Sequence, residues 1–324
     1  MVESVAAIVE IAEIVLAAAL VLPCTVLLVE VLSAVGRGRA NTPQPRAETT
    51  RRAILMPAHN EEAVIQATLS TLTPQLHPTD RLVVVADNCT DATADIARRA
   101  GATVLERQND RQRGKGYALD FGLRYLSNDA PDVLVMIDAD CQVQPGAIDA
   151  IANLALTTQR PVQATYLLAA SPEPSPKEMV STFAFKGKNL VRPLGLRVLG
   201  QPCLLTGTGM AFPWASLKDV DLASGNIVED MKLGLDLAIA GHPPIMCPDA
   251  LCIGEQPQQA ATAMTQRTRW EHGHLQTLLT CVPPLLWQGI KQGRLGLMAL
   301  ALDLCVPPLS LLLMLWLAGA SAIT

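Results

Sequence analysis

Aromatic side chains make up only 3% of the 324-residue chain, and the formal net charge is −5. Few rings are therefore available to stack on bases, and no basic excess would attract a phosphate backbone, so the sequence predicts no nucleic-acid partner. Eight cysteines are scattered singly, and the closest pair, Cys247 and Cys252, lacks CxxC spacing. This usage excludes a disulfide framework and a structural zinc site, and it is typical of reduced thiols that face the cytosol.

Two glycine-rich nucleotide motifs are also missing. No GxGxxG follows the first strand-like run, 53–56, which disfavours a nicotinamide dehydrogenase. The loop 111–116 (RQRGKG) contains two glycines and three basic residues without the spacing of a P-loop. A solvated basic loop is the commoner meaning of such a stretch, although its cations would also suit a bound diphosphate.

Lysine and arginine are absent from both ends of the chain, before Arg37 and after Arg294. Residues 14–29 are uncharged and, with their flanks, reach the roughly 20 residues that span a bilayer. A cleaved signal peptide is disfavoured because a basic n-region is missing. Residues 295–318 form a second candidate span, interrupted by Asp303 and by a Pro-Pro pair. The positive-inside rule then predicts a multi-pass protein of the cell (inner) membrane, with everything between the spans in the cytoplasm.

Strand-like and helical runs alternate between these spans. Apolar runs precede helical stretches four times in succession, at 53–56, 82–86, 103–105 and 133–137. Four such units predict an α/β fold with a Rossmann-like, mostly parallel sheet. Residues 171–176 (SPEPSP) mark a change to a second half, in which 204–210 is expected to be a strand whose glycines let a ligand approach.

These patterns divide the chain into five parts. We expect an N-terminal transmembrane segment (1–36), a linker (37–52), the α/β domain (53–260), interfacial helices interrupted by prolines (261–293) and a C-terminal transmembrane segment (294–324).

The most informative stretch is 133–141, VLVMIDADC, which predicts a buried strand ending in Asp138 and Asp140. Ligands of open α/β sheets bind outside the carboxyl ends of the strands. Two carboxylates this close repel each other unless a cation lies between them, and Mg²⁺ or Mn²⁺ shared with substrate phosphates would serve. On spacing alone, a strand that ends in two solvated acids is an equally good interpretation.

Polar residues follow two other predicted strands at the same sheet edge. Pro57, Ala58, Asn60 and Glu61 follow the first strand, where Asn60 could equally be a helix cap, and Asp87 follows the second.

Later in the chain, Glu229 and Asp230 form a second acidic pair, unremarkable alone because acids favour helix N-termini. Gln266, Arg269 and Trp270 (QRTRW) precede His272 and His274, two histidines that are more often structural than metal ligands.

In this order, the motifs resemble the membrane-bound, inverting family 2 glycosyltransferases. That group includes the cellulose, chitin, hyaluronan and poly-N-acetylglucosamine synthases of polysaccharide biosynthesis and ceramide glucosyltransferase. The resemblance spans roughly residues 53–270 and rests on the ordered set Asp87, Asp138-Ala139-Asp140, Glu229-Asp230 and Gln266-x-x-Arg269-Trp270. It implies a GT-A fold, a nucleotide-sugar donor (a UDP-sugar is favoured) and a divalent metal, Mg²⁺ or Mn²⁺.

The resemblance also implies roles for individual residues. Asp230, with Glu229, would act as the catalytic base, and Asp138 and Asp140 would hold the metal-bound diphosphate. The nucleotide sugar would contact Pro57, Ala58, Asn60, Glu61, Asp87, Lys115, Asp138 and Asp140. The acceptor and the diphosphate would contact Gly207, Thr208, Gln266, Arg269 and Trp270. A base on the acceptor hydroxyl and charge relief on the leaving diphosphate are what a single displacement at the anomeric carbon needs.

The chain departs from the polymer synthases, which carry several helices after the Gln-x-x-Arg-Trp motif. One span is expected here, and two spans cannot wall a polysaccharide channel. The acceptor is then a lipid, or the protein forms a homo-oligomer, or the chain is part of a longer protein. Two other functions stay open: a polyprenyl-phosphate sugar transferase, which the Gln-x-x-Arg-Trp motif disfavours, and a catalytically silent nucleotide-binding membrane subunit, which the intact acids disfavour.

Overall fold

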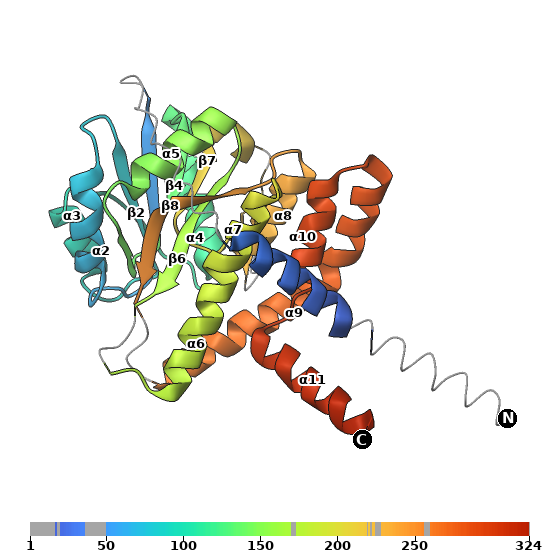
Figure 1. Cartoon of the computed structure of the whole chain (residues 1–324). Coiled ribbons are helices and arrows are strands. Elements are labelled where there is room, and N and C mark those ends of the chain that lie inside the picture. Colours follow the sequence, from blue (N-terminus) through green and yellow to red (C-terminus); the bar gives the residue numbers. More distant parts are fainter. Residues whose placement is uncertain are drawn as a thin grey trace.

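The computed structural model describes residues 17, 20–35, 50–169, 173–218, 220, 222–223, 228–255 and 260–323. Within them, one sheet contains the strands β1 (Arg52–Ala58), β2 (Arg81–Asp87), β3 (Thr103–Arg107), β4 (Val133–Met136), β5 (Cys141–Val143), β6 (Val162–Leu168), β7 (Met210–Pro213) and β8 (Ile245–Gly254). The strand order is β3-β2-β1-β4-β7-β6-β8-β5 (Figure 1).

The first four strands pair in parallel, and they are the strands expected from the alternating pattern. In the other half of the sheet, β7 runs antiparallel to β4 and β6, and β5 runs antiparallel to β8, whereas β6 and β8 are parallel. The predicted mixed α/β class with a mostly parallel sheet is confirmed.

Strands β1, β2 and β4 are apolar on both faces because helices cover both faces of the sheet. On one face lie α2 (Ile65–Leu72), α3 (Thr93–Arg99) and α5 (Ala147–Thr158). On the other lie α4 (Lys115–Leu126) and α8 (Glu229–Ile239). Short 3-10 turns occur at η1 (Thr73–Gln75), η2 (Ser127–Asp129) and η4 (Trp214–Leu217).

The expected strand at 204–210 is wrong, because regular pairing begins only at Met210. Gly207 and Gly209 have φ angles of +96° and +65°, which the extended conformation of a strand does not allow. Gly209 also has no room for a side chain, since a Cβ there would lie 2.8 Å from the Cβ of Ala164. The stretch is therefore a loop that enters β7.

The second half begins with a nearly continuous helical run. It consists of α6 (Pro176–Lys186), a π-helical turn η3 (Gly187–Val191) and α7 (Arg192–Val198). Ser175 and Glu178 form a capping box at the start of α6, close to the predicted break in the pattern.

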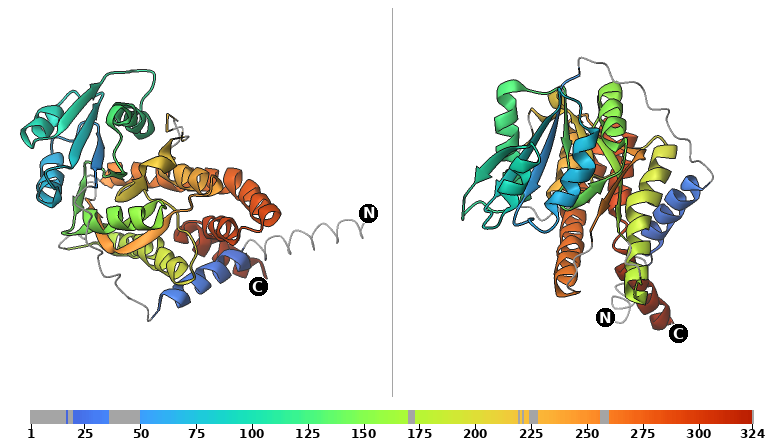
Figure 2. Two further views of the ribbon diagram at one scale, coloured as in Figure 1. Left: turned by 90° about the horizontal axis from the view of Figure 1, so that it is seen from above. Right: turned by 90° about the vertical axis from the view of Figure 1, so that its left-hand side faces the viewer.

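Three helices and an N-terminal helix (Leu20–Ala34) project from one side of the sheet domain (Figures 1 and 2). The three are α9 (Ala260–Gln292), α10 (Leu295–Leu304) and α11 (Leu309–Ile323). The expected interruption of α9 is wrong, because Pro283 and Pro284 lie inside one assigned helix. Leu20 of the N-terminal helix lies 3.1 Å from where a Cβ of Gly319 in α11 would be, so the first and last described helices are neighbours.

No single described helix is long and apolar enough to cross a membrane. The segments Leu295–Leu304 and Leu309–Gly319 reach that length and composition only as a pair, bent by 71°. The first of them, α10, packs into a cluster with α8 and α9, and its Leu297 and Leu300 are buried. The predicted C-terminal span is thus bent where Pro307 and Pro308 follow α10. Of the predicted N-terminal span, 14–29, the described residues 20–29 belong to the helix Leu20–Ala34, which is apolar but too short to cross a membrane by itself. Most of the predicted linker, 37–52, lies outside the described residues.

Candidate active site

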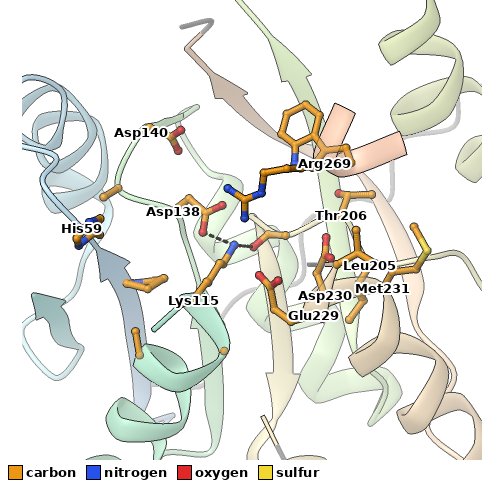
Figure 3. Close-up of a pocket in the computed structure, with 18 of the residues that line it drawn as sticks. His59, Lys115, Asp138, Asp140, Leu205, Thr206, Glu229, Asp230, Met231 and Arg269 are labelled. Atoms are coloured by element: carbon orange, nitrogen blue, oxygen red, sulfur yellow. Dashed lines mark hydrogen bonds and ion pairs between the residues drawn. The ribbon is translucent and has the colours of Figure 1, made fainter. Parts of the chain in front are cut away.

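A cavity of about 520 Å³ opens at the carboxyl ends of β1, β2 and β4 (Figure 3). Its strand side is made of residues at the ends of those strands or just after them, namely Pro57, Ala58, Glu61, Asp87, Asp138 and Asp140. Its helix side is made of residues on α6, η3, α8 and α9, namely Phe185, Lys188, Asn189, Glu229, Asp230, Arg269 and Trp270. Lys115 and Gly207 line the cavity as well.

The Asp138-Ala139-Asp140 turn is held from two directions. The hydroxyl of Thr68 donates to the carbonyl of Ala139 at 2.7 Å, and the backbone N–H of Asp138 donates to the hydroxyl of Thr208 at 3.0 Å. Thr208 is fully buried, so this predicted site residue supports the turn from beneath and does not line the cavity.

Asn60 was also expected among the ligand contacts, but it does not line the cavity. Its side-chain oxygen accepts a hydrogen bond from the backbone N–H of Thr90 at 2.8 Å, and its φ is +55°. Asn60 therefore ties the loop after β1 to the loop after β2. Asp87, in contrast, lines the cavity and forms a buried ion pair with Arg107 at 2.6 Å.

Lys115 stands between the two sides. Its ammonium lies 2.5 Å from Asp138 and donates to the carbonyl of Gly207 at 2.8 Å. A Cβ at Gly207 would lie 3.2 Å from the carboxylate of Asp230, 3.4 Å from that ammonium and 3.9 Å from the carboxylate of Asp138, so three charged groups converge on a glycine. Burial lowers the pKa of Lys115, but the carboxylates of Asp138, Glu229 and Asp230 more than offset this, and its pKa lies above the usual range.

The Gly207 loop is anchored by one buried amide. The side chain of Gln163 donates to the carbonyl of Thr208 at 2.8 Å and accepts from the backbone N–H of Thr206 at 2.9 Å. The loop is therefore held close to Asp138 and Asp230 at the same time.

Glu229 and Asp230 begin α8 and face the cavity. Burial raises the pKa of Glu229 to about 7, although Lys115 opposes the rise. Burial also raises the pKa of Asp230 above its usual value, again against the opposing charge of Lys115. The sequence could not give the sign of this shift, because a helix start and a cation lower the pKa while burial raises it.

Arg269 and Trp270 reach the cavity from α9. The Trp270 ring lies 6.2 Å from that of Phe185 on α6, and Phe185 lies 5.3 Å from Tyr166 on β6 in an edge-on contact. Gln266 lies on α9, and its side chain is outside the described part of the chain. His274 is buried with its Nε2 3.2 Å from the carbonyl of Leu304, and burial lowers its pKa to about 3, which fits a structural role.

Sequence reasoning missed several residues that line the cavity. They are His59, Asn88, Arg113, Tyr166, Phe185, Lys188 and Asn189. Arg113 lies in the basic loop 111–116, whose charge was visible. Lys188 and Asn189 carry no motif at all, because they enter the site through the turn of η3.

The acidic residues on the strand side suit a divalent cation. Among the described residues, no group of three or more His, Cys, Asp or Glu is arranged as a complete metal site. Burial, followed by the charge of Asp138, raises the pKa of Asp140, and burial with Asp140 and Asp138 raises that of Glu61 to about 7. Carboxylates that crowd each other in this way fit a hard cation held by Asp138 and Asp140, with phosphate and water oxygens as the other ligands.

Solved structures include a similar fold. A mannosyltransferase from Pyrobaculum calidifontis, in complex with GDP-Man and Mn²⁺, superposes with a TM-score of 0.62 over 97% of this chain and 90% of that one, at 18% identity. This likeness shows the fold and confirms the GT-A architecture that the motifs implied.

Curated relatives match a shorter stretch of the chain. The probable glycosyltransferase YdaM of Bacillus subtilis is 35% identical over 29% of this chain and 23% of its own length. The 4,4'-diaponeurosporenoate glycosyltransferase of Staphylococcus haemolyticus is 34% identical over 30% of this chain and 26% of its own. The chain thus matches about a quarter of the length of these relatives. The family model described as glycosyltransferase like family 2 matches residues 50–273, more than half of the chain, and the chain therefore belongs to the family 2 glycosyltransferases.

Proposed function

We propose that this protein transfers a sugar from a nucleotide sugar, with a UDP-sugar favoured, to a hydroxyl of a lipid or polysaccharide acceptor at a membrane, with inversion at the anomeric carbon. The observation that carries the proposal is one cavity in which an acidic strand side faces a second acidic pair across Lys115. The two sides supply the two requirements of the reaction, which are stabilisation of the leaving diphosphate and activation of the acceptor.

The strand side would bind the donor. Pro57, Ala58, Glu61 and Asp87 would contact the nucleotide, and Asp138 and Asp140 would hold Mg²⁺ or Mn²⁺. When bound, the cation would neutralise charge that develops on the leaving diphosphate. Arg269 and Lys115 both line the cavity and would add fixed positive charge around the same group.

Asp230 would act as the general base. Its carboxylate would accept the proton of the acceptor hydroxyl while that oxygen bonds to the anomeric carbon. The bond from the anomeric carbon to the diphosphate breaks in the same step, and the diphosphate leaves with the electron pair. A buried carboxylate with a raised pKa is a stronger base when ionised, and the neighbouring Lys115 favours the ionised form. Glu229 would shape the electrostatic environment of this pair.

An amphiphilic lipid acceptor fits the surface around the cavity better than a polymer. Large apolar side chains are exposed on three helices in this part of the molecule. They are Val21, Leu22, Leu28, Val29 and Leu32 on the N-terminal helix with Val35 just after it, Met179, Val180 and Phe183 on α6, and Leu313, Met314, Leu315, Trp316 and Leu317 on α11. These helices lie on one side of the molecule in all views (Figures 1 and 2). Exposed apolar side chains on one side of the molecule favour contact with a membrane, which would bring a lipid to the cavity.

A product assay tests the proposed function. Purified full-length protein is incubated with a panel of nucleotide sugars and membrane lipids, with Mn²⁺ or with EDTA, and products are identified by mass. We expect a glycosylated lipid that forms only with the divalent ion. UDP binding without any product would favour the silent subunit, and full activity of Asp230→Asn would favour a phosphate acceptor, which needs no base.

The location of the protein also follows from the proposal. Because all basic residues lie between Arg37 and Arg294, we place the catalytic domain on the cytoplasmic side. A reporter cysteine placed at one of residues 41–50 should resist an impermeant thiol reagent in intact cells and react after lysis. Efficient labelling in intact cells would reverse this orientation.

A further inference from the structure

An ion pair joins Lys115 to the proposed metal site. The ammonium lies 2.5 Å from Asp138, and within the described residues no other Lys, Arg or His lies at ion-pair distance from Asp138 or Asp140. The side chains of Lys115 and Asp138 are 24% and 27% exposed, so a solute can reach the pair from the cavity. A divalent cation held by Asp138 and Asp140 would need the carboxylate that Lys115 already neutralises.

The two positive charges compete for this carboxylate. An ammonium and a divalent cation on one carboxylate repel each other, so binding of the cation weakens the ion pair of Lys115 unless the ammonium has a second anion within reach. In the described part of the chain, neither Glu229 nor Asp230 lies at ion-pair distance from Lys115. A diphosphate would be that second anion, because carboxylates and substrate phosphates commonly bind the same hard cation and are thereby brought together.

The geometry of Lys115 allows the ammonium to change partner with little movement. Lys115 is the first residue of α4, and its ammonium also donates to the carbonyl of Gly207 at 2.8 Å. The buried amide of Gln163 holds the loop around that carbonyl. An ammonium has three N–H donors, of which Asp138 and Gly207 use two. The bond to Gly207 can therefore stay while Asp138 is exchanged for a phosphate oxygen.

We propose, on the basis of the proposed function, that Lys115 couples the binding of the metal to the binding of the nucleotide diphosphate. Its ammonium is the counter-ion of Asp138 until a divalent cation takes that carboxylate, and it then pairs with the diphosphate. The cation alone binds weakly because it separates an ion pair. The cation binds tightly together with a nucleoside diphosphate because the ammonium is then paired again.

This role differs in a measurable way from that of a fixed charge on the cavity wall. A lysine with the same interactions in every state would repel the cation and attract the diphosphate independently, so its removal would change both affinities but not the coupling between them. A lysine that changes partner contributes to the coupling itself. The coupling factor is the UDP affinity at saturating Mn²⁺ divided by the UDP affinity in EDTA, and by linkage it equals the factor by which UDP strengthens Mn²⁺ binding.

Calorimetry with UDP and the full-length protein, in Mn²⁺ and in EDTA, measures this factor in the wild type and in two variants. Lys115→Met removes the charge and the hydrogen bond to Gly207, whereas Lys115→Gln removes the charge and keeps a donor for that carbonyl. We expect the coupling factor to fall about tenfold or more in both variants, because a charge-assisted hydrogen bond contributes about that much. Melting temperatures measured in EDTA establish that each variant is folded.

Arg113 supplies a matched control two residues earlier. It lines the same cavity, and among the residues that the structure describes it forms no ion pair. Arg113→Met removes one positive charge from the cavity wall, and the coupling factor should stay within about twofold of the wild-type value. A coupling factor as low in Arg113→Met as in Lys115→Met would overturn the proposal, since any cation on the wall would then have the same effect.

Two further outcomes would also overturn it. An unchanged coupling factor in both Lys115 variants would make Lys115 a fixed charge. A loss in Lys115→Met that is restored in Lys115→Gln would mean that Lys115 only supports the Gly207 loop. Failure of the proposed function is a separate result, because the calorimetry uses neither a sugar donor nor an acceptor. Absence of a glycosylated product with the coupling factor intact would count against the proposed function alone.

Discussion

The two sides of the cavity are built in different ways. On the strand side, Asp87 ends β2, and Asp138 and Asp140 come just after β4. The turn between these two is held by a hydrogen bond that the Thr68 hydroxyl donates to Ala139 and by one that the Thr208 hydroxyl accepts from the backbone N–H of Asp138. On the helix side, the lining residues come from α6, η3, α8 and α9, segments that meet only through tertiary packing. The strand side, where we propose that the donor binds, is therefore a local property of the sheet. The helix side, where we propose that the acceptor binds, depends on how the outer helices pack on the sheet.

The largest difference between the two sides should appear with Asp140→Asn. The change removes a charged ligand from the proposed metal site, so we expect turnover to be abolished and UDP binding in the presence of Mn²⁺ to weaken about 10²-fold or more. Calorimetry with Mn²⁺ and with EDTA measures the second effect. Unchanged UDP affinity in the variant would remove the metal from the donor side.

Asp230→Asn should separate chemistry from donor binding. It keeps the shape and hydrogen bonding of the side chain but removes the proton acceptor, so turnover should fall about 10²–10⁴-fold while UDP affinity stays near that of the wild type. Single-turnover rates measure the loss of turnover, and calorimetry measures the UDP affinity. An equal loss of UDP binding in Asp140→Asn and Asp230→Asn would mean that both acids hold the donor.

Arg192→Met should affect the helix side alone. Arg192 is buried between Glu30 and Asp303, and its removal leaves two buried carboxylates without a counter-ion, which costs about 3–5 kcal/mol of unfolding free energy. Thermal or denaturant unfolding measures the loss. Arg197→Met, which loses a hydrogen bond to the Met246 carbonyl, is the control and should cost only about 1 kcal/mol. The UDP affinity of the folded protein should be the same in the wild type, Arg192→Met and Arg197→Met.

The pH dependence of stability should distinguish the two sides more finely. The pKa of Glu229 is about 7 in the folded protein, above its unfolded value, so this group stabilises the fold at low pH and loses that contribution as pH rises to about 7. The slope for one such proton is at most about 1.4 kcal/mol per pH unit. The difference in melting temperature between the wild type and Glu229→Gln, measured from pH 4.5 to 7, isolates the contribution of Glu229 to the pH dependence of stability.

Glu61 is the matching group on the strand side, since its pKa is also raised to about 7. Addition of Mn²⁺ and UDP should suppress the contribution of Glu61 to the pH dependence of stability, which is measured as the difference between the wild type and Glu61→Gln, because the cation compensates the crowded acids. The contribution of Glu229, measured in the same way with Glu229→Gln, should persist. Suppression of both slopes would place the cation within reach of both sides.

The smallest effect is expected at Asn60. Asn60→Ala loses the hydrogen bond to Thr90 and strains a residue with positive φ, so stability should fall by about 1–2 kcal/mol. UDP affinity at saturating Mn²⁺ should change less than about twofold, because Asn60 does not line the cavity. A tenfold loss of affinity with unchanged stability would restore the direct role first expected from the sequence.

The same contrast explains how much could be predicted. The runs that became β1, β2, β3 and β4 are continuous and apolar, so both the parallel half of the sheet and the position of its acidic ends were readable. Strand β8 was missed because Pro248 and Asp249 interrupt it like a turn. A register shift in its pairing with β6, between Ala164 and Thr165, accommodates the irregularity.

On the helix side, only segments with a family motif could be predicted. Asp230, Arg269 and Trp270 were identified by the order of the motifs, but their distances to one another depend on packing that no short pattern encodes. Lys188 and Asn189 were missed for the same reason, since a single lysine and asparagine within a helical run are ordinary surface residues by pattern. The sign of the Asp230 pKa shift depends on burial, which also comes from tertiary structure.

The π turn at Gly187–Val191 has a consequence for insertions and deletions. An α-helix advances about 100° per residue, so loss of one residue from this turn would rotate everything before it relative to α7 by that angle. If Arg192 kept its two carboxylates, Lys188 and Asn189 would then turn away from the cavity. Related chains that keep these two side chains on the cavity wall should therefore keep the length of this segment constant, even where its other side chains differ.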